Sequence, residues 1–214
     1  MNTKPAGKTT GKHVEKPVER PVEKKVESAE KILDTTRQAV PFNTGNIPGP
    51  KMARPVMANV SGKMLAKAKR PLLIVGSEIK DEKVLAKVIA FGQKGIQIAA
   101  VGNAIAFLGN KGLDAHYANM HALASYLCDP EWKGLDGKGG YDLVVFFGIT
   151  YYYASQAISA LKNFSKIKVV SIDKYYHPNA DMSFGNLKNN VFIEALDEVL
   201  AQLPKKDPLF KYGD

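Results

Sequence analysis

Short apolar runs alternate with longer amphipathic stretches from about residue 59 to residue 204. Each of the four principal runs is six or seven residues long and mostly apolar, with valine and isoleucine frequent. That pattern predicts strands buried on both faces, as in a parallel sheet covered by helices. The predicted strands are Pro71–Gly76, Ile96–Gly102, Asp142–Gly148 and Ile167–Asp173, with Val191–Ile193 as a last short strand.

The stretches between these runs carry apolar residues at helical spacing. One example is the stripe formed by Val84, Val88 and Phe91. Ser61 is the predicted N-cap of the first helix. The predicted helices are Gly62–Lys69, Asp81–Lys94, Asn103–Leu108, His116–Leu127, Tyr151–Asn163 and Glu194–Leu203. The alternation predicts an α/β domain with a doubly wound, mostly parallel sheet of about six strands.

The N-terminal part of the chain has a different pattern. A four-residue unit repeats in HVEKPVERPVEKKVES, and one valine in four residues does not build a core. Val26–Val40 has the composition of a short helix, and Pro41–Val56 is rich in proline and glycine, as in a linker. We therefore expect an arm and linker over residues 1–58, the α/β domain over 59–204 and a tail over 205–214. Deleting Met1–Val40 should then leave the melting temperature of the core unchanged.

Composition narrows the function classes. The net charge is +9, but the basic residues are dispersed, which gives nucleic-acid binding little support. No apolar run approaches the ~20 residues of a membrane helix, and no secretory signal is evident, so we expect a cytoplasmic protein without membrane insertion. The single cysteine, Cys128, excludes an intrachain disulfide and a cluster with four cysteine ligands from this chain. The four histidines show no tight metal-ligand spacing, so no metal site is predicted.

Small and polar residues end each of the principal strands, where ligands bind in open α/β sheets. Glycines there allow a tight turn and close approach of a ligand, while the side chains after them offer hydrogen bonds to a phosphate or ribose. Turns of this kind favour the same residues without any ligand, and neither GxGxxG nor GxxxxGK[ST] occurs. The candidate cofactor-binding residues are Gly76, Ser77, Gly102, Asn103, Gly148 and Asp173. No nucleophile–base pair stands out, so no catalytic residue is predicted.

Five tyrosines follow two strand ends that we expect to be neighbours. Tyrosine is enriched at protein interfaces because it combines a large apolar face with a polar tip. Three consecutive helical residues span about 200°, so Tyr151–Tyr153 cannot all face the core. The candidate partner interface consists of Tyr151, Tyr152, Tyr153, Tyr175 and Tyr176.

Three segments together resemble the epsilon subunits of archaeal carbon monoxide dehydrogenase. They are AKAKRPLLIVGSEI, the stretch from YLCDPEWKGLDG to ISALKNF, and NADMSFGNL, and the resemblance covers about Ile47–Leu203. The resemblance implies the central-domain fold of thiamine-diphosphate enzymes, which binds FAD in some relatives. It also implies assembly with a large alpha subunit, two of each, within the acetyl-CoA decarbonylase/synthase complex of anaerobic one-carbon metabolism.

The resemblance sets the leading functional hypothesis. The alpha subunit would hold the nickel–iron–sulfur centre, and this chain would be non-catalytic, stabilising alpha or helping electrons pass toward a flavin or ferredoxin-type partner. The alternative is a module that binds FAD or a dinucleotide at the strand ends. A free-standing enzyme of the thiamine type is disfavoured, because the other domains of such enzymes are missing. The arm of VEK repeats lies outside the family pattern, and we expect it to dock on a neighbouring subunit.

Overall fold

The computed structural model describes residues 33–43, 45, 51–109 and 111–204 of the 214-residue chain. These residues all belong to one unit, which spans Ile32–Asp214. The VEK repeats and the predicted C-terminal tail lie outside the described residues, so the interpretation of both stays a prediction.

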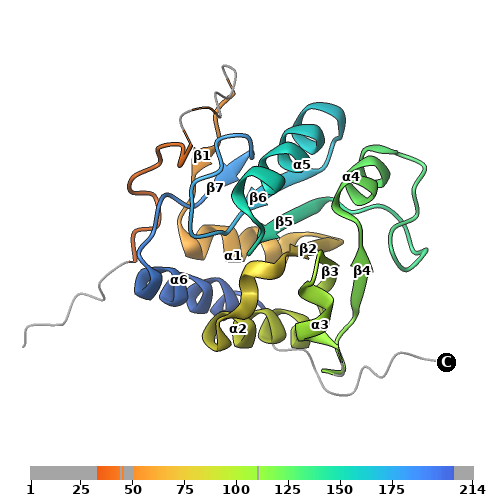
Figure 1. Ribbon diagram of the computed structural model, residues 1–214, viewed down its shortest axis with the longest axis horizontal. Helices are drawn as coiled ribbons and strands as arrows, with labels where there is room; N and C mark the ends of the chain where they lie inside the picture. Colours follow the sequence, from red (N-terminus) through yellow and green to blue (C-terminus); the bar gives the residue numbers. More distant parts are fainter. Residues whose placement is uncertain (1–32, 44, 46–50, 110, 205–214) are drawn as a thin grey trace, which may run out of the picture. The chain divides into compact units, whose positions relative to one another are not determined.

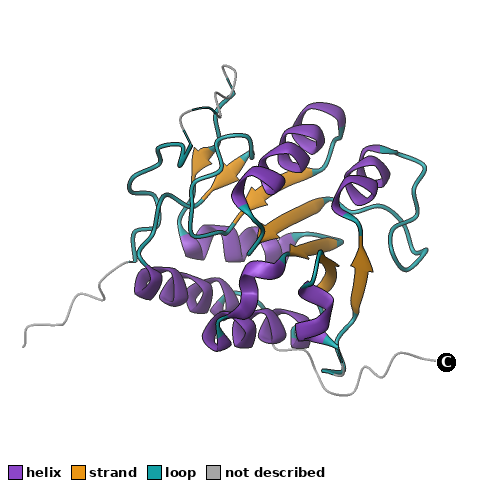
Figure 2. Cartoon of the chain, viewed as in Figure 1, coloured by secondary structure: helices purple, strands orange, loops and turns teal. Residues whose placement is uncertain are grey.

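A single parallel sheet forms the centre of the fold (Figures 1 and 2). Its strand order is β1-β7-β6-β5-β2-β3-β4, and every pairing is parallel. Without the two-residue edge strand β1, this is the 3-2-1-4-5-6 order of doubly wound nucleotide-binding domains. The predicted α/β class is therefore confirmed. The strands are β1 Arg54–Pro55, β2 Pro71–Val75, β3 Gln97–Val101, β4 Ala115–Ala118, β5 Leu143–Phe147, β6 Lys168–Ser171 and β7 Met182–Ser183.

Helices cover both faces of the sheet, which explains why its central strands are apolar throughout (Figure 1). Side chains alternate along each strand, so Leu73 and Val75 join one core cluster while Leu72 and Ile74 join the other. One layer contains α1 Ala58–Lys67, α2 Glu82–Gln93, α3 Ala104–Leu108 and α6 Asn189–Ala201, and the other contains α4 Met120–Cys128 and α5 Tyr151–Phe164. A short 3-10 helix, η1 Ser77–Lys80, follows β2.

The start of the first helix differs from the prediction. Ser61 is not the N-cap, because α1 begins one turn earlier at Ala58. The backbone N–H groups of Val60 and Ser61 both donate to the Met57 carbonyl, and the buried Ser61 hydroxyl donates to the Ala58 carbonyl. This extra turn buries Ala58 in the core, and that packing stabilises the longer helix.

The predicted helix His116–Leu127 is two elements. Its first residues belong to β4, which pairs with β3, and α4 begins only at Met120. Asn119 separates them, since its side chain accepts hydrogen bonds from the N–H groups of His121 and Ala122. A side-chain cap of this kind fixes the start of a helix, so the strand ends before it.

The predicted last strand is also wrong. Val191–Ile193 lies inside α6, where Phe192, Leu196 and Val199 form a buried stripe at helical spacing. The last strand is instead β7, which the sequence pattern did not reveal because two residues carry no periodicity. It pairs with β6 on one side and β1 on the other.

The segment 33–43 packs against Gly185 and Asn186, which follow β7. No helix is present in the described part of the predicted helix Val26–Val40, and the rest of it lies outside the described residues. The buried Thr35 hydroxyl donates to the Val56 carbonyl at 2.7 Å, and its carbonyl accepts from Gly185 N at 2.8 Å. A Cβ at Gly185 would lie 1.8 Å from the Arg37 carbonyl oxygen, so only glycine fits.

The predicted linker contributes further to the core. Ala53 and Val56 are buried, and Arg54–Pro55 forms the edge strand β1. The expected domain boundary at residue 58 stays a prediction, but residues before it supply these contacts. Deletion of Met1–Val40 would remove Thr35 and with it the hydrogen bonds to Val56 and Gly185, so these contacts argue against the expectation of an unchanged melting temperature.

Candidate functional site

A cavity of about 610 Å³ lies at the carboxyl ends of the strands. Its walls come from the η1–α2 segment, the β5–α5 turn, the end of β6 and the first turn of α6. The sheet order reverses between β2 and β5, because β3 and β4 lie on one side of that pair and β6 and β7 on the other. Ligands of open α/β sheets bind at such a switch point, and the volume is within the ordinary range of ligand sites.

The β5–α5 turn forms one wall of the cavity and depends on Gly148. This residue has a φ of 62°, which side-chain-bearing residues rarely adopt. A Cβ there would lie 2.7 Å from Cγ2 of Ile79. The Gly148 carbonyl accepts from Glu78 N at 2.9 Å, and its N–H donates to Oδ2 of Asp173 at 2.8 Å. Two glycine properties are therefore used at once, namely the left-handed conformation and the missing side chain.

Asp173 follows β6 and faces this turn. Its Oδ1 accepts from Lys174 N at 2.6 Å, in addition to the bond from Gly148 N. Burial raises the pKa of Asp173 to about 6, although the backbone amides of Lys174, Gly148 and Ile149 favour its charged form. The negative charge of Glu78 acts in the same direction as burial. A cleft carboxyl with a pKa displaced toward neutrality is typical of a functional position.

The other predicted cofactor-binding residues lie beside or beneath the cavity. Gly76 is buried under the β5–α5 turn, where a Cβ would lie 2.7 Å from the Gly148 carbonyl oxygen. The Ser77 hydroxyl accepts from Asn103 N at 3.0 Å and so ties the end of β2 to the end of β3. Gly102 has a φ of 60° in that second turn. Of the six predicted residues, Gly148 and Asp173 line this cavity, and the remaining four do not.

Two of the five predicted interface tyrosines are buried within this chain. Tyr176 is 1% exposed and donates through its hydroxyl to the Ala53 carbonyl at 2.6 Å. Tyr151 donates to the Tyr176 carbonyl at 3.2 Å, and its ring stacks on His177 with 4.4 Å between centroids. Both side chains pack in the core of this chain, so the structure corrects the prediction that placed them in a partner interface.

The remaining three predicted tyrosines keep exposed surface. Tyr152 is 58% exposed, as expected from the geometry of three consecutive helical tyrosines. Tyr153 is half-buried, with its hydroxyl 3.3 Å from Nδ1 of His121. Phe42 is 51% exposed and contacts Tyr175 and Tyr151, with ring centroids 4.2 and 5.3 Å away. We call Phe42, Tyr152 and Tyr175, which keep exposed surface, the aromatic cluster.

Several lining residues were not predicted from the sequence. Asn189 and Asn190 line the cavity and directly precede a segment that was predicted as a strand. Lys83 resembled an ordinary solvated lysine. The one available signal was position, because Lys174 directly follows the candidate Asp173.

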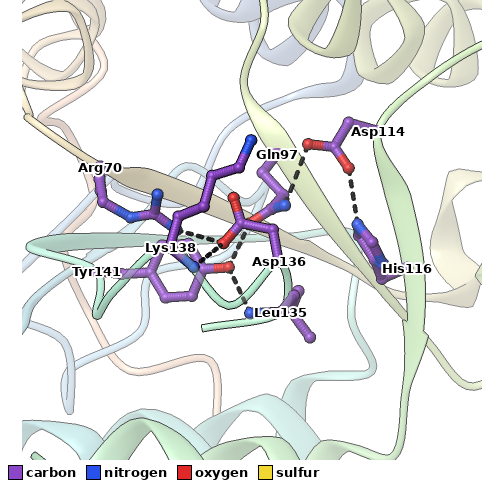
Figure 3. Close-up of polar contacts among 8 residues, drawn as sticks. All are labelled: Arg70, Gln97, Asp114, His116, Leu135, Asp136, Lys138 and Tyr141. Carbon is purple, nitrogen blue, oxygen red and sulfur yellow. Dashed lines mark hydrogen bonds and ion pairs between the residues drawn. The ribbon is translucent and has the colours of Figure 1, made fainter. Parts of the chain in front are cut away.

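A second polar network lies at the opposite, amino-terminal edge of the sheet (Figure 3). The buried Tyr141 hydroxyl donates to Oε1 of Gln97 and accepts from Leu135 N. Arg70 forms an ion pair with Asp136 at 2.7 Å and lies over the Tyr141 ring. Figure 3 shows the network continuing through Gln97 to Asp114 and His116.

This network fastens the loop that contains DPEWKGLDG to the starts of β2, β3 and β5. Gly134 in that loop has a φ of 79°, and a Cβ there would lie 2.5 Å from the Gly139 carbonyl oxygen. Trp132 stacks on Tyr126 and packs on Tyr141. The motif is therefore explained by folding of the loop rather than by the cavity.

Within the described ranges, no three His, Cys, Asp or Glu side chains are grouped so as to hold a metal ion. In the same part of the chain, no helix has both the length and the apolar character needed to cross a bilayer.

Comparison with known proteins supplies the family. A family model described as "CO dehydrogenase beta subunit/acetyl-CoA synthase epsilon subunit" matches residues 35–200. The chain belongs to this family. The resemblance seen in the sequence is thereby confirmed, and the match extends it to the segment that packs on Gly185.

Individual members of the epsilon family from archaea are similar over most of their length. The acetyl-CoA decarbonylase/synthase complex subunit epsilon of Methanothrix soehngenii is 46% identical, over 82% of this chain and 97% of the relative. Subunit epsilon 2 of Methanosarcina mazei is 42% identical, over 79% and 98%. Subunit epsilon 1 of Methanosarcina barkeri is 42% identical, over 80% and 100%.

Proposed function

We propose that this chain is a non-catalytic subunit of an acetyl-CoA decarbonylase/synthase complex. In that role it stabilises the alpha subunit, which would hold the nickel–iron–sulfur centre of carbon monoxide dehydrogenase. The observation that carries the proposal is the 42–46% identity to named epsilon subunits across nearly their whole length. An assembly of two alpha and two epsilon subunits, with electrons passing to a flavin or ferredoxin-type partner, is the corresponding expectation for the complex.

The aromatic cluster is the surface that we assign to contact with the partner subunit. It combines Phe42 and Tyr152, both more than half exposed, with the half-buried Tyr175. Exposed aromatic groups of this kind are enriched in protein interfaces and frequently contribute most of the binding energy. Lys174 lies over the Tyr175 ring at 5.1 Å, which places a positive charge at the margin of the surface.

Replacement of one exposed tyrosine tests this assignment. Tyr152→Ser should weaken association of the full chain with the nickel-containing partner by at least about tenfold, the cost of about 1.4 kcal/mol expected for an interface aromatic residue. Association is measured by titrating the purified chain into the complex depleted of it. Tyr126→Ser changes a tyrosine of similar exposure, 53%, on a different helix and is the matched control.

Two results would contradict the proposal at different levels. Equal loss with both tyrosine variants would remove the aromatic cluster from the interface but leave membership of the complex intact. Purification of the native chain without any nickel–iron partner would refute the subunit role itself.

A second candidate function is binding of FAD or a dinucleotide in the 610 Å³ cavity. The position of the cavity at the switch point of a 3-2-1-4-5-6 sheet favours it. The test is denaturation of the natively purified protein, followed by an absorption spectrum of the supernatant and thermal shifts with FAD and NAD. Absence of flavin absorbance together with unchanged melting would exclude this candidate.

A further inference from the structure

The hydrogen-bond donors of the β5–α5 turn bind a carboxylate of the protein itself, that of Asp173. Gly148 N donates to Oδ2 of Asp173 at 2.8 Å, and the Ile149 amide also contacts this carboxylate. Amide groups at the N-terminus of a helix are a general binding position for anions, including the phosphates of ligands. Here the carboxylate of Asp173 occupies the corresponding position.

The next donor along the chain is engaged in the same way. Thr150 occupies the N-cap position of α5, but its hydroxyl does not cap the helix. It donates instead to Oε1 of Glu78 at 3.3 Å. Two donors that a phosphate would use, Gly148 N and the Thr150 hydroxyl, therefore face internal carboxylates.

We propose that Asp173 determines which ligands the cavity accepts, because its carboxylate fills the anion position of the β5–α5 turn and excludes phosphate, sulfate and carboxylate groups from it. A ligand of this cavity then presents neutral groups or hydrogen-bond donors to Asp173. The inference concerns the cavity of the second candidate function and does not depend on membership of the complex. A pyrophosphate group can occupy the turn only when Asp173 is displaced or protonated.

Some charged residues around Asp173 oppose the binding of an anion and others favour it. An anion at the turn would be repelled by carboxylates and attracted by lysines that line the same cavity, so the lysines alone do not decide the outcome. The titratable groups that face the cavity are Glu78 from η1, Asp81 and Lys83 from the start of α2, Tyr151 from α5, and Lys174 and Tyr175 after β6. The lining residues from α6 are Asn189, Asn190, Phe192 and Ile193, which carry no charge.

A purely structural role for Asp173 is the competing interpretation, and Asp142 offers the matched comparison. Its two carboxylate oxygens accept from Lys69 N and Arg70 N, each at 2.8 Å, at the other edge of the sheet. Asp142 does not line the cavity. If Asp173 only fastens the backbone, its removal should have no more effect on anion binding than removal of Asp142.

Sulfate is a suitable probe because it remains a dianion throughout the pH range of the test. The full chain is labelled with ¹⁵N, and the amide signals of Gly148 and Ile149 are followed during titration with sulfate at pH 8. We expect Asp173→Ala to bind sulfate at least about tenfold more tightly than the wild type, since a charge-assisted contact becomes available. Asp142→Ala should behave like the wild type.

The pH dependence of the wild type gives a second measurement that needs no variant to fold. Sulfate binding at Gly148 should strengthen as the pH falls from 8 to 5, because Asp173 becomes neutral through about pH 6. Glu78→Gln should retain this response, and Asp173→Asn should lose it. The proposal is overturned if wild-type sulfate binding at Gly148 is equally strong at pH 8 and pH 5, or if folded Asp173→Ala gains no affinity.

Discussion

At the residue scale, two titratable side chains that follow β6 make the fold sensitive to pH. Asp173 and His177 lie four residues apart after β6, and burial shifts the pKa of each toward its neutral form. His177 is 1% exposed, and its Nδ1 has no hydrogen-bond partner within the described residues. Its ring is held by stacking on Tyr151. Such a group makes stability depend on pH.

We predict that His177 destabilises the fold in acid. Burial lowers its pKa from 6.5 to about 4, so the unfolded chain binds a proton that the folded chain does not. Its contribution is therefore neutral above pH 6.5, and up to about 3 kcal/mol of unfolding free energy is lost between pH 6.5 and 4. Urea unfolding of wild type and His177→Phe at pH 7.5, 6 and 5 should give curves that converge as pH rises.

The wild type has to be compared with His177→Phe, because Asp173 changes the stability of the fold with pH in the opposite direction. Its pKa is raised to about 6, so the folded state gains stability as the pH falls below that value. The difference between wild type and His177→Phe cancels this contribution. A parallel shift of the two curves at every pH would contradict the assignment, and His121→Phe, at an exposed histidine, is the control.

At the element scale, helix starts show where local sequence and local structure agree. Asp81 and Asn119 are side-chain caps, each accepting two backbone hydrogen bonds. Asn103 occupies the same position before α3 but forms no side-chain cap, and its N–H donates to Ser77. The same residue type therefore has two different roles before two helices.

This contrast gives a matched pair of variants. Asn119→Ala should lower the free energy of unfolding by about 1 kcal/mol, the usual cost of a lost N-cap. Asn103→Ala should cost less than about 0.5 kcal/mol, because no capping bond is lost. Chemical denaturation of both variants at one pH measures the difference, and equal losses would show that capping does not decide the start of α4.

At the scale of the whole molecule, segments distant in sequence complete the domain. Thr35 and Gln38 accept backbone hydrogen bonds from Gly185 and Asn186, and the Asn186 side chain donates to the carbonyls of Gln38 and Val40. The MSFGNL motif therefore anchors the segment 33–43. This segment contributes Phe42 to the aromatic cluster. The segment is thus fixed to the core through Thr35 and contacts the cavity residue Tyr175 through Phe42.

Two deletions should separate this segment from the residues before it. Removal of residues 1–40 takes away the acceptors of Gly185 N and Asn186 N and the Thr35 hydroxyl that donates to Val56, and each lost hydrogen bond costs about 0.5–1.5 kcal/mol. For a domain of this size the melting temperature should fall by about 5 °C or more. Removal of residues 1–31 eliminates none of the described contacts and should leave it unchanged, as measured by calorimetry.

The periodic segments of the domain were predictable, and the irregular ones were not. Four predicted strands are present because long apolar runs fit only the doubly buried centre of a parallel sheet. The edge strands β1 and β4 and the neighbouring β7 have two to four residues, too few to show a period. Gly148 and Asp173 were identified as site residues from their place after strands, whereas Asn189 and Asn190 reach the cavity only through the start of α6.

The sequence by itself determined the α/β class, the principal strands and helices, and the family, because periodicity and motifs are local properties of the chain. Only the tertiary structure decided how polar groups are paired. It shows that Tyr151 and Tyr176 are buried, that Phe42 lies against Tyr175, and that the carboxylate of Asp173 faces the Gly148 amide. The physical reason is that hydrogen-bond partners 25 or more residues apart become neighbours only when the sheet forms, and no local pattern records them.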